Sequence, residues 1–96
     1  MVCDVSIIIP LFNEAPNAKP LYERLSSTLA AYGRSYEVVF VDDGSTDSTF
    51  ETLRAFQEQD SHIVLVQFLR NFGQQAAIAA GIQYAQKATT LELEKQ

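Results

Sequence analysis

Two adjacent carboxylates, Asp42 and Asp43, are the sharpest chemical feature of the sequence. They follow the run YEVVFV at 36–41, which is typical of a buried strand, and a charge at the end of such a strand needs a ligand donor, a cation or a helix N-terminus. Gly44 permits a positive φ, and Ser45 can bond backbone groups or sugar hydroxyls. One aspartate could cap the next helix while the other is solvated, but that would not account for both carboxylates and the glycine. An EF-hand is excluded because the loop lacks alternating ligands.

A second polar cluster follows another run that indicates a buried strand. The β-branched stretch from Val5 ends at Pro10, whose missing N–H stops the pairing of the strand. Directly after it come Phe12, Asn13 and Glu14. An aromatic ring beside a carboxamide and a carboxylate can sandwich a planar base and read its edge. An ordinary turn at the start of a helix is the alternative interpretation.

A third cluster comprises Arg70, Asn71 and Gly73, after the apolar run HIVLVQF at 62–68. It sets a guanidinium beside the expected start of a helix, and that combination suits a diphosphate. A surface arginine next to an asparagine cap explains the same residues equally well.

The elements that position these clusters alternate along the chain. Strands are predicted at 5–10, 36–41 and 62–68, each followed by a helix. We expect the first helix to be capped by Asn17 and closed by Gly33, and the second to carry a capping box formed by Ser48 and Glu51. Strand, helix, strand with short connections demands a parallel sheet with right-handed crossovers. Ligands of such sheets bind beyond the carboxyl ends of the strands, where all three clusters fall.

Composition limits the classes of protein. The chain has 96 residues, 47% of them hydrophobic, which indicates one small α/β domain. A net charge of -5 argues against nucleic acid as a partner. Cys3 is the only cysteine, so the chain can form no internal disulfide or thiolate zinc site, and a reducing compartment is favoured. No apolar run approaches the ~20 residues of a membrane helix, and the chain itself is expected to be cytoplasmic.

Three segments together, VSIIIPLFNE, YEVVFVDDGSTDST and LRNFGQQAAIAAGIQYA, resemble the opening of inverting glycosyltransferases of the GT-A fold. They are most similar to the family 2 enzymes that move a sugar from a nucleotide donor to a polyprenyl or dolichyl phosphate. The similarity covers about residues 5–86, and the three motifs occur in the right order and at suitable spacing. The fold it implies is a truncated Rossmann-like parallel sheet with strand order 3-2-1.

The resemblance also implies the roles of the clusters. Pro10, Phe12, Asn13 and Glu14 would flank the nucleoside of a UDP-sugar or GDP-sugar. Asp43, with Asp42 beside it, would read the base, and Gly44 and Ser45 would shape the pocket. Arg70, Asn71 and Gly73 would approach the donor. In the parent enzyme, Mg²⁺ or Mn²⁺ would bridge the diphosphate at the cytoplasmic face of a membrane.

The sequence departs from that family after residue 86. A fourth strand ending in a metal-binding Asp-x-Asp is expected there. TLELE at 90–94 imitates this pattern with Glu92 and Glu94, but it arrives about two residues early. We expect residues 1–86 to form the nucleotide-binding half, and residues 87–96 to form a solvated tail or an extension of the third helix. No catalytic or metal-binding residue is assigned, and no tight binding of a metal is expected. The first strand would then have an unpaired edge, which predicts a homo-oligomer.

Other classes of protein share some of these features. A non-catalytic interaction or oligomerisation module is the main alternative. A receiver domain would carry its paired aspartates after the first strand, not the second. A dinucleotide-binding domain would need G-x-G-x-x-G where this chain has Pro10-Leu11-Phe12.

Overall fold

Strands and helices alternate along the chain, as the sequence predicts. The computed structural model describes residues 3–85 and 87–92. The elements are β1 (Cys3–Leu11), α1 (Ala15–Tyr32), β2 (Tyr36–Asp42), α2 (Thr49–Gln59), β3 (Ile63–Gln67), α3 (Gln74–Tyr84) and β4 (Lys87–Glu92). Within this described part, no helix is both long and apolar enough to cross a membrane.

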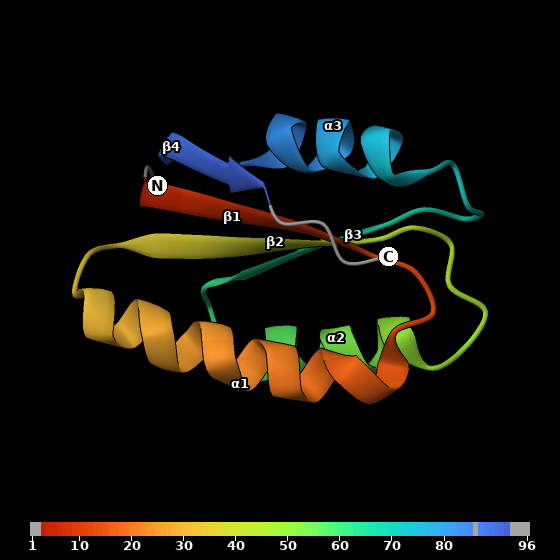
Figure 1. Cartoon of the computed structure of the whole chain (residues 1–96), viewed down its shortest axis with the longest axis horizontal. Coiled ribbons are helices and arrows are strands. Elements are labelled where there is room, and N and C mark those ends of the chain that lie inside the picture. The colour runs from red at the N-terminus through yellow and green to blue at the C-terminus, as the bar shows by residue number, and fades with distance from the viewer. Residues whose placement is uncertain (1–2, 86, 93–96) are drawn as a thin grey trace.

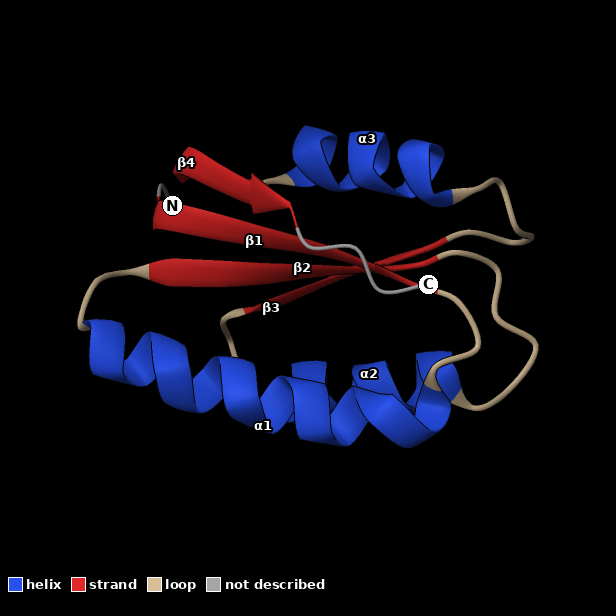
Figure 2. Ribbon diagram, viewed as in Figure 1, coloured by secondary structure: helices blue, strands red, loops and turns tan. Residues whose placement is uncertain are grey.

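The four strands form one parallel sheet in the order β3-β2-β1-β4. Helices α1 and α2 lie on one face of the sheet and α3 lies on the other (Figures 1 and 2). The predicted parallel α/β fold and the strand order 3-2-1 are therefore confirmed, with β4 added beside β1. Because all strands run the same way, the loops that follow β1, β2 and β3 meet at one edge of the sheet.

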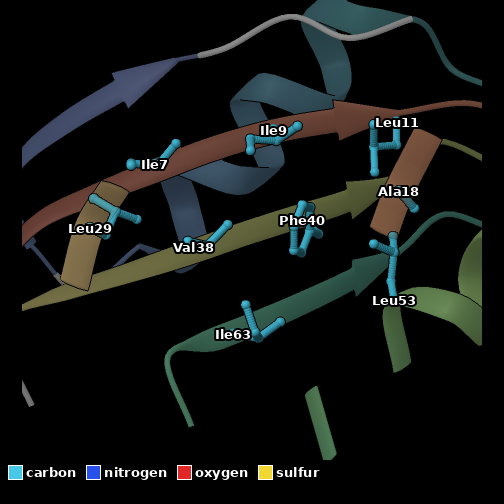
Figure 3. Packing of buried hydrophobic residues seen from close by; sticks show 9 residues of the cluster. All are labelled: Ile7, Ile9, Leu11, Ala18, Leu29, Val38, Phe40, Leu53 and Ile63. Atoms are coloured by element: carbon cyan, nitrogen blue, oxygen red, sulfur yellow. The ribbon is translucent and has the colours of Figure 1, made fainter. Parts of the chain in front are cut away.

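The larger part of the core lies between the sheet and the helices α1 and α2. Residues from both helices and from β1, β2 and β3 form this cluster (Figure 3), namely Ile7, Ile9, Leu11, Ala18, Leu29, Val38, Phe40, Leu53 and Ile63. Phe40 and Leu53 are fully buried. Burial of each such side chain contributes about 1.5–3 kcal/mol to stability, so this face anchors β1 and β2, which carry the first two polar clusters.

The opposite face of the sheet is covered by α3 at close range. The α3 residues Ala77 and Gly81 are buried against it. A Cβ on Gly81 would lie 2.4 Å from Cγ2 of Ile8, so a larger residue could not occupy this position without a shift of the helix or of the Ile8 side chain. The small residues Ala77 and Gly81 therefore allow α3 to pack close to the sheet.

The predicted cap of the first helix is wrong by three residues. Helix α1 begins at Ala15 and its N-cap residue is Glu14, not Asn17. Pro16 lies in the first turn, and Pro20 lies inside the helix on its exposed side. The prediction failed because Asp47 and Thr49, more than thirty residues along the chain, bind the N–H groups at this helix start. Gly33 closes the helix as expected, with φ of 79°.

The predicted capping box of α2 is also absent. Ser48 is the N-cap residue, as expected, but its side chain forms no capping hydrogen bond. Instead Oδ1 of Asp47 accepts a hydrogen bond from the backbone N–H of Thr49 at 2.9 Å. An aspartate that bonds the N–H two residues ahead makes the serine hydroxyl unnecessary as a cap.

The tail predicted after residue 86 contains a strand. Residues Lys87–Glu92 form β4, which pairs in parallel with β1 from Cys3 to Ile8, so neither a solvated tail nor an extension of α3 is present there. Residues 93–96, which include Glu94, lie outside the described residues. Pairing with β1 satisfies backbone groups that an open edge would expose, so the premise that β1 has an unpaired edge is wrong. Self-association stays a prediction, and the outer strand on this side is now β4.

Candidate functional site

The loops after β1, β2 and β3 lie together at the carboxyl edge of the sheet (Figure 1). We call residues 12–14 the first loop, 43–48 the second loop and 68–73 the third loop. Backbone hydrogen bonds join their bases, from Asp43 N–H to the carbonyl of Leu11 (2.8 Å) and from Phe68 N–H to the carbonyl of Asp42 (2.9 Å). The predicted convergence of the three clusters at one edge is therefore present in the structure.

Asn13 joins the first loop to the second. Its side-chain Oδ1 accepts hydrogen bonds from the backbone N–H groups of Thr46 (2.8 Å) and Asp47 (3.3 Å). Its own backbone N–H donates to Oγ of Ser45 at 2.9 Å. The Asn13 backbone has φ of 53°, a left-handed conformation that asparagine tolerates better than most residues. One residue of the first loop thus holds three consecutive residues of the second.

Asp47 and Thr49 connect the starts of α1 and α2. The N–H of Glu14 donates to Oγ1 of Thr49 (3.0 Å), and the N–H of Ala15 donates to Oδ2 of Asp47 (3.3 Å). The Thr49 hydroxyl donates to the other oxygen of Asp47. This bond from Thr49 lowers the pKa of Asp47 below its ordinary value. The helix starts therefore share one capping group, which fixes where the first loop ends.

Asp43 joins the second loop to the third. Its side chain is fully buried, and its oxygens accept hydrogen bonds from the N–H of Phe72 (2.8 Å) and the N–H of Gly73 (3.1 Å). The side-chain amide of Asn71 donates to the same carboxylate at 3.1 Å and to the Asp43 carbonyl at 3.2 Å. A carboxylate at the start of a helix interacts favourably with the helix dipole. Asp43 therefore occupies the position before α3 where the sequence predicts an anion.

Gly44 allows the third loop to lie directly on the second. A Cβ at this position would fall 2.1 Å from the backbone carbonyl carbon of Arg70 and 2.3 Å from the backbone nitrogen of Asn71. The φ of Gly44 is 73°, a conformation that disfavours any side chain. Glycine is therefore required at this position for two reasons: its positive φ, and the close approach of the Arg70 and Asn71 backbone.

Asp42 has a different environment from its neighbour. It is 1% exposed, one of its oxygens accepts a hydrogen bond from the N–H of Ser45 (3.2 Å), and its Oδ2 is buried without a hydrogen-bond partner. Burial raises the pKa of the Asp42 carboxyl, although the Ser45 hydrogen bonds act in the opposite direction. A buried oxygen without a partner is costly and uncommon in proteins, so it marks this position for a ligand or a proton.

The third loop presents exposed side chains at the same edge. The guanidinium of Arg70 lies 4.8 Å from the centroid of the Phe72 ring, and Phe72 packs edge-on against Phe68. Leu69 is 96% exposed and Phe72 is 54% exposed. A cation and two apolar side chains thus stand beside the loops without being buried by described residues.

The structure brings nearly all the predicted site residues to this edge. Those that contact a neighbouring loop are Asn13, Glu14, Asp43, Gly44, Ser45, Asn71 and Gly73, while Asp42, Phe12 and Arg70 lie beside them. Pro10 does not stop the pairing of the strand as predicted. It is buried within β1 and paired in register with Val41, and Leu11 continues the pairing with Asp42. Whether any of these residues binds a nucleotide stays a prediction.

Two residues important for the geometry were not among the predicted site residues. They are Asp47 and Thr49, which cap both helix starts. Their spacing, an aspartate two positions before a threonine at the start of a helix, is a signal that could have identified them. The hydrogen bonds to the first loop could not have been read from spacing, because they join residues more than thirty positions apart.

The last property of this edge is its supply of metal-ligating side chains. Within residues 3–85 and 87–92, no group of three or more His, Cys, Asp and Glu side chains is placed to hold a metal ion. The paired aspartates are only two side chains and do not form such a group. The described donors therefore do not fit a metal centre by themselves.

Comparison with known proteins places this arrangement in a class. The fold is that of the GT-A glycosyltransferases. The chain matches TarS residues 1–349 of S. aureus with a TM-score of 0.78 and 23% identity, over 95% of this chain and 27% of that one. It matches the mannosyltransferase PcManGT of Pyrobaculum calidifontis, solved with GDP-Man and Mn²⁺, with a TM-score of 0.71 and 25% identity, over 88% of this chain and 25% of that one.

Sequence comparison gives the family. The model of glycosyl transferase family 2 matches residues 6–91, and the chain belongs to that family. The undecaprenyl-phosphate 4-deoxy-4-formamido-L-arabinose transferase of Salmonella paratyphi B is 41% identical over 81 residues, which are 83% of this chain and 25% of the relative. The corresponding transferase of Salmonella newport matches equally well. The chain spans about a quarter of the length of these curated relatives.

Proposed function

We propose that this chain supplies the nucleotide-recognising half of a glycosyltransferase that moves a sugar from a UDP-linked or GDP-linked donor to a polyprenyl phosphate, with inversion. The chain by itself would bind the nucleotide weakly and would not complete the transfer. Support for the acceptor comes from the Salmonella relatives, whose name includes undecaprenyl phosphate. Support for the donor comes from the mannosyltransferase bound to GDP-Man.

The observation that carries the proposal is the mutual attachment of the three loops. Asn13 ties the first loop to the second, and Asp43 and Gly44 tie the second to the third. The surface that results is held in place before any ligand arrives, which reduces the entropy cost of binding. Its position at the carboxyl ends of parallel strands is where open α/β sheets bind nucleotides.

Specific groups at this surface suit parts of a nucleotide-sugar. The guanidinium of Arg70 is exposed and lies over the Phe72 ring. It can pair with a diphosphate oxygen through its N–H groups. The half-buried Phe12 offers an apolar surface for a base. The Asp43 carboxylate already accepts three hydrogen bonds. To bind Asp43, a nucleobase would have to share an oxygen with one of these donors or displace it.

A divalent cation is proposed for the whole enzyme and not for the described part of this chain. The support is the Mn²⁺ in the mannosyltransferase structure and the shared family. Among the described residues, no group of three or more His, Cys, Asp and Glu side chains is placed to hold such an ion.

Calorimetric titration of the chain with UDP, GDP, UDP-glucose and GDP-mannose tests the proposal. We expect saturable binding of at least one nucleotide and a loss of affinity on the order of tenfold in Arg70→Gln, because a charge-assisted hydrogen bond to phosphate is removed. Arg24→Gln is the matched control, since Arg24 is exposed on α1 far from the three loops. Absence of saturable binding by all four compounds would refute nucleotide recognition by this chain.

A further inference from the structure

We propose that Asn13 is a positioning residue, which holds the second loop in its binding conformation and does not itself accept a hydrogen bond from the nucleotide. The expected effect of Asn13 on nucleotide affinity rests on the proposed function. Its structural part, the attachment of the second loop, can be tested without any ligand.

The hydrogen-bonding capacity of the Asn13 oxygen is the first argument. A carboxamide oxygen has two lone pairs, and here it accepts from the N–H groups of Thr46 (2.8 Å) and Asp47 (3.3 Å). The Thr46 hydroxyl approaches the same oxygen at 3.4 Å. An oxygen so engaged has no capacity left to accept a donor from a nucleobase.

The backbone of Asn13 is the second argument. Asn13 is the sole residue other than glycine with a positive φ among the residues that the structure describes. This conformation lets the chain turn from the end of β1 at Leu11 to the start of α1 at Ala15 within three residues. Asparagine combines tolerance of positive φ with a side-chain acceptor, and glycine supplies only the first of these properties.

The partners of Asn13 show which surface it controls. Ser45, Thr46 and Asp47 are consecutive, and together with Gly44 they form the turn between β2 and α2. The same turn carries Asp43 on one side, and Asp43 fixes the third loop. Release of the second loop at Asn13 would therefore disturb the surface that the nucleotide is proposed to contact, without emptying the hydrophobic core.

Two substitutions separate positioning from direct contact. Asn13→Asp keeps an oxygen that can accept from Thr46 and Asp47, but it removes the amide donor and adds negative charge next to an anionic ligand. Asn13→Gly keeps the positive φ and removes the side-chain acceptor altogether. The chain with Gly33→Ala is the matched control, because it strains a positive φ at the far end of α1, away from the loops.

The ligand-free measurement is amide hydrogen exchange by NMR at Thr46 and Asp47. We expect the wild-type protein and Asn13→Asp to protect these amides to similar extents. In Asn13→Gly, exchange should be roughly fivefold to tenfold faster, as expected for the loss of a typical hydrogen bond. Unchanged protection in Asn13→Gly would overturn the attachment itself.

The ligand-bound measurement is titration with UDP and GDP. Positioning predicts that Asn13→Asp binds the better of the two nucleotides within about threefold of wild type, that Asn13→Gly binds roughly tenfold more weakly, and that Gly33→Ala binds like wild type. Equal weakening by both Asn13 substitutions, with protection retained in Asn13→Asp, would show that holding the second loop is not sufficient for binding and would overturn the proposal. If wild type bound neither nucleotide, the proposed function and with it the nucleotide role of Asn13 would fail, while the exchange data would still decide whether Asn13 holds the second loop.

Discussion

Asp42 and Asp43 are neighbours in the sequence, yet they belong to two different regions of the molecule. Asp43 is directed to the loop before α3, where three donors satisfy its carboxylate. Asp42 is directed to the turn before α2, where one oxygen accepts from Ser45 and the other has no partner. Both side chains are buried, so the difference lies in hydrogen bonding and not in access to water.

The contrast shows what each carboxylate does for the site. Adjacent residues at the end of a strand point to opposite faces of the sheet, so the pair reaches the helix layers on both sides. Asp43 fixes the position of the third loop and is occupied in doing so. Asp42 accepts a hydrogen bond through one oxygen, and its other oxygen has no partner. Fewer contacts are therefore lost when Asp42 is replaced than when Asp43 is replaced. Substitutions on the Asp43 side should therefore cost more than substitutions on the Asp42 side.

The largest effect is expected at Gly44. Gly44→Ala would place a methyl group 2.1 Å from the Arg70 backbone and force an alanine to φ of 73°. We expect the free energy of unfolding to fall by about 3 kcal/mol or more, because backbone atoms cannot move aside as a flexible side chain can. Urea unfolding followed by circular dichroism measures this loss.

Gly33→Ala is the control for that prediction. Gly33 has a similar φ of 79°, but nothing lies within 4 Å of the added Cβ. The free energy of unfolding of Gly33→Ala should fall only by the cost of the strained backbone, about 1–2 kcal/mol. Equal losses for the two glycines would show that the close contact between the second and third loops is not required.

The next effect is expected for Asp43→Asn. The substitution keeps the shape of the side chain but replaces one acceptor oxygen with an NH₂ group that faces backbone donors, so a backbone N–H at the start of α3 loses its partner. A loss of about 2–3 kcal/mol in the free energy of unfolding is expected. Asp42→Asn, the same change one residue earlier, should cost no stability at neutral pH, because Oδ2 of Asp42 has no hydrogen-bond partner to lose. If the two variants lost the same stability by chemical denaturation, the contrast between the two carboxylates would be wrong.

Thr49→Val tests the cap that Asp47 and Thr49 form at the starts of α1 and α2. This cap lies on the same side of the sheet as Asp42. Valine keeps the volume of this fully buried residue and removes the hydroxyl that binds both Glu14 and Asp47. We expect a loss of about 1–2 kcal/mol, since the N–H of Glu14 is left without a partner. Thermal and urea unfolding would measure it, and Thr28→Val on the exposed side of α1 is the control. No difference between the two valine variants would remove Thr49 from the geometry of the site.

The smallest effect is the pH dependence contributed by Asp42. Burial raises the pKa of this carboxyl in the folded state, so the folded chain binds the proton more tightly than the unfolded chain does. The stability that this difference contributes is present below the unfolded pKa of about 4 and is lost as the pH rises through the folded pKa. Asp42→Asn should therefore gain stability relative to wild type between pH 4 and pH 7, with no gain near pH 3. Parallel pH profiles of the two proteins in urea unfolding would contradict this.

The order of elements and the site edge could be predicted from the sequence for a physical reason. A β-branched run such as Ile7 to Ile9 is compatible with a strand buried on both faces, and the short connections permit only a parallel sheet. That direction alone brings the three polar clusters to one edge. The start of α1 could not be predicted, because Asp47 and Thr49 bind its first N–H groups across more than thirty residues. Strand β4 was missed because its pairing with β1, and not its own composition, makes it a strand.

What the sequence by itself determined is which groups stand at the carboxyl edge, since local patterns of apolar residues, glycine and aspartate set strand ends and turns. Only the tertiary structure decided which of these groups are free to meet a ligand. Asn13 and Asp43 look like ligand-reading residues in the sequence, but the loops beside them take up their acceptor oxygens. The reason is that the donors within reach of a polar side chain depend on how distant segments of the chain pack together.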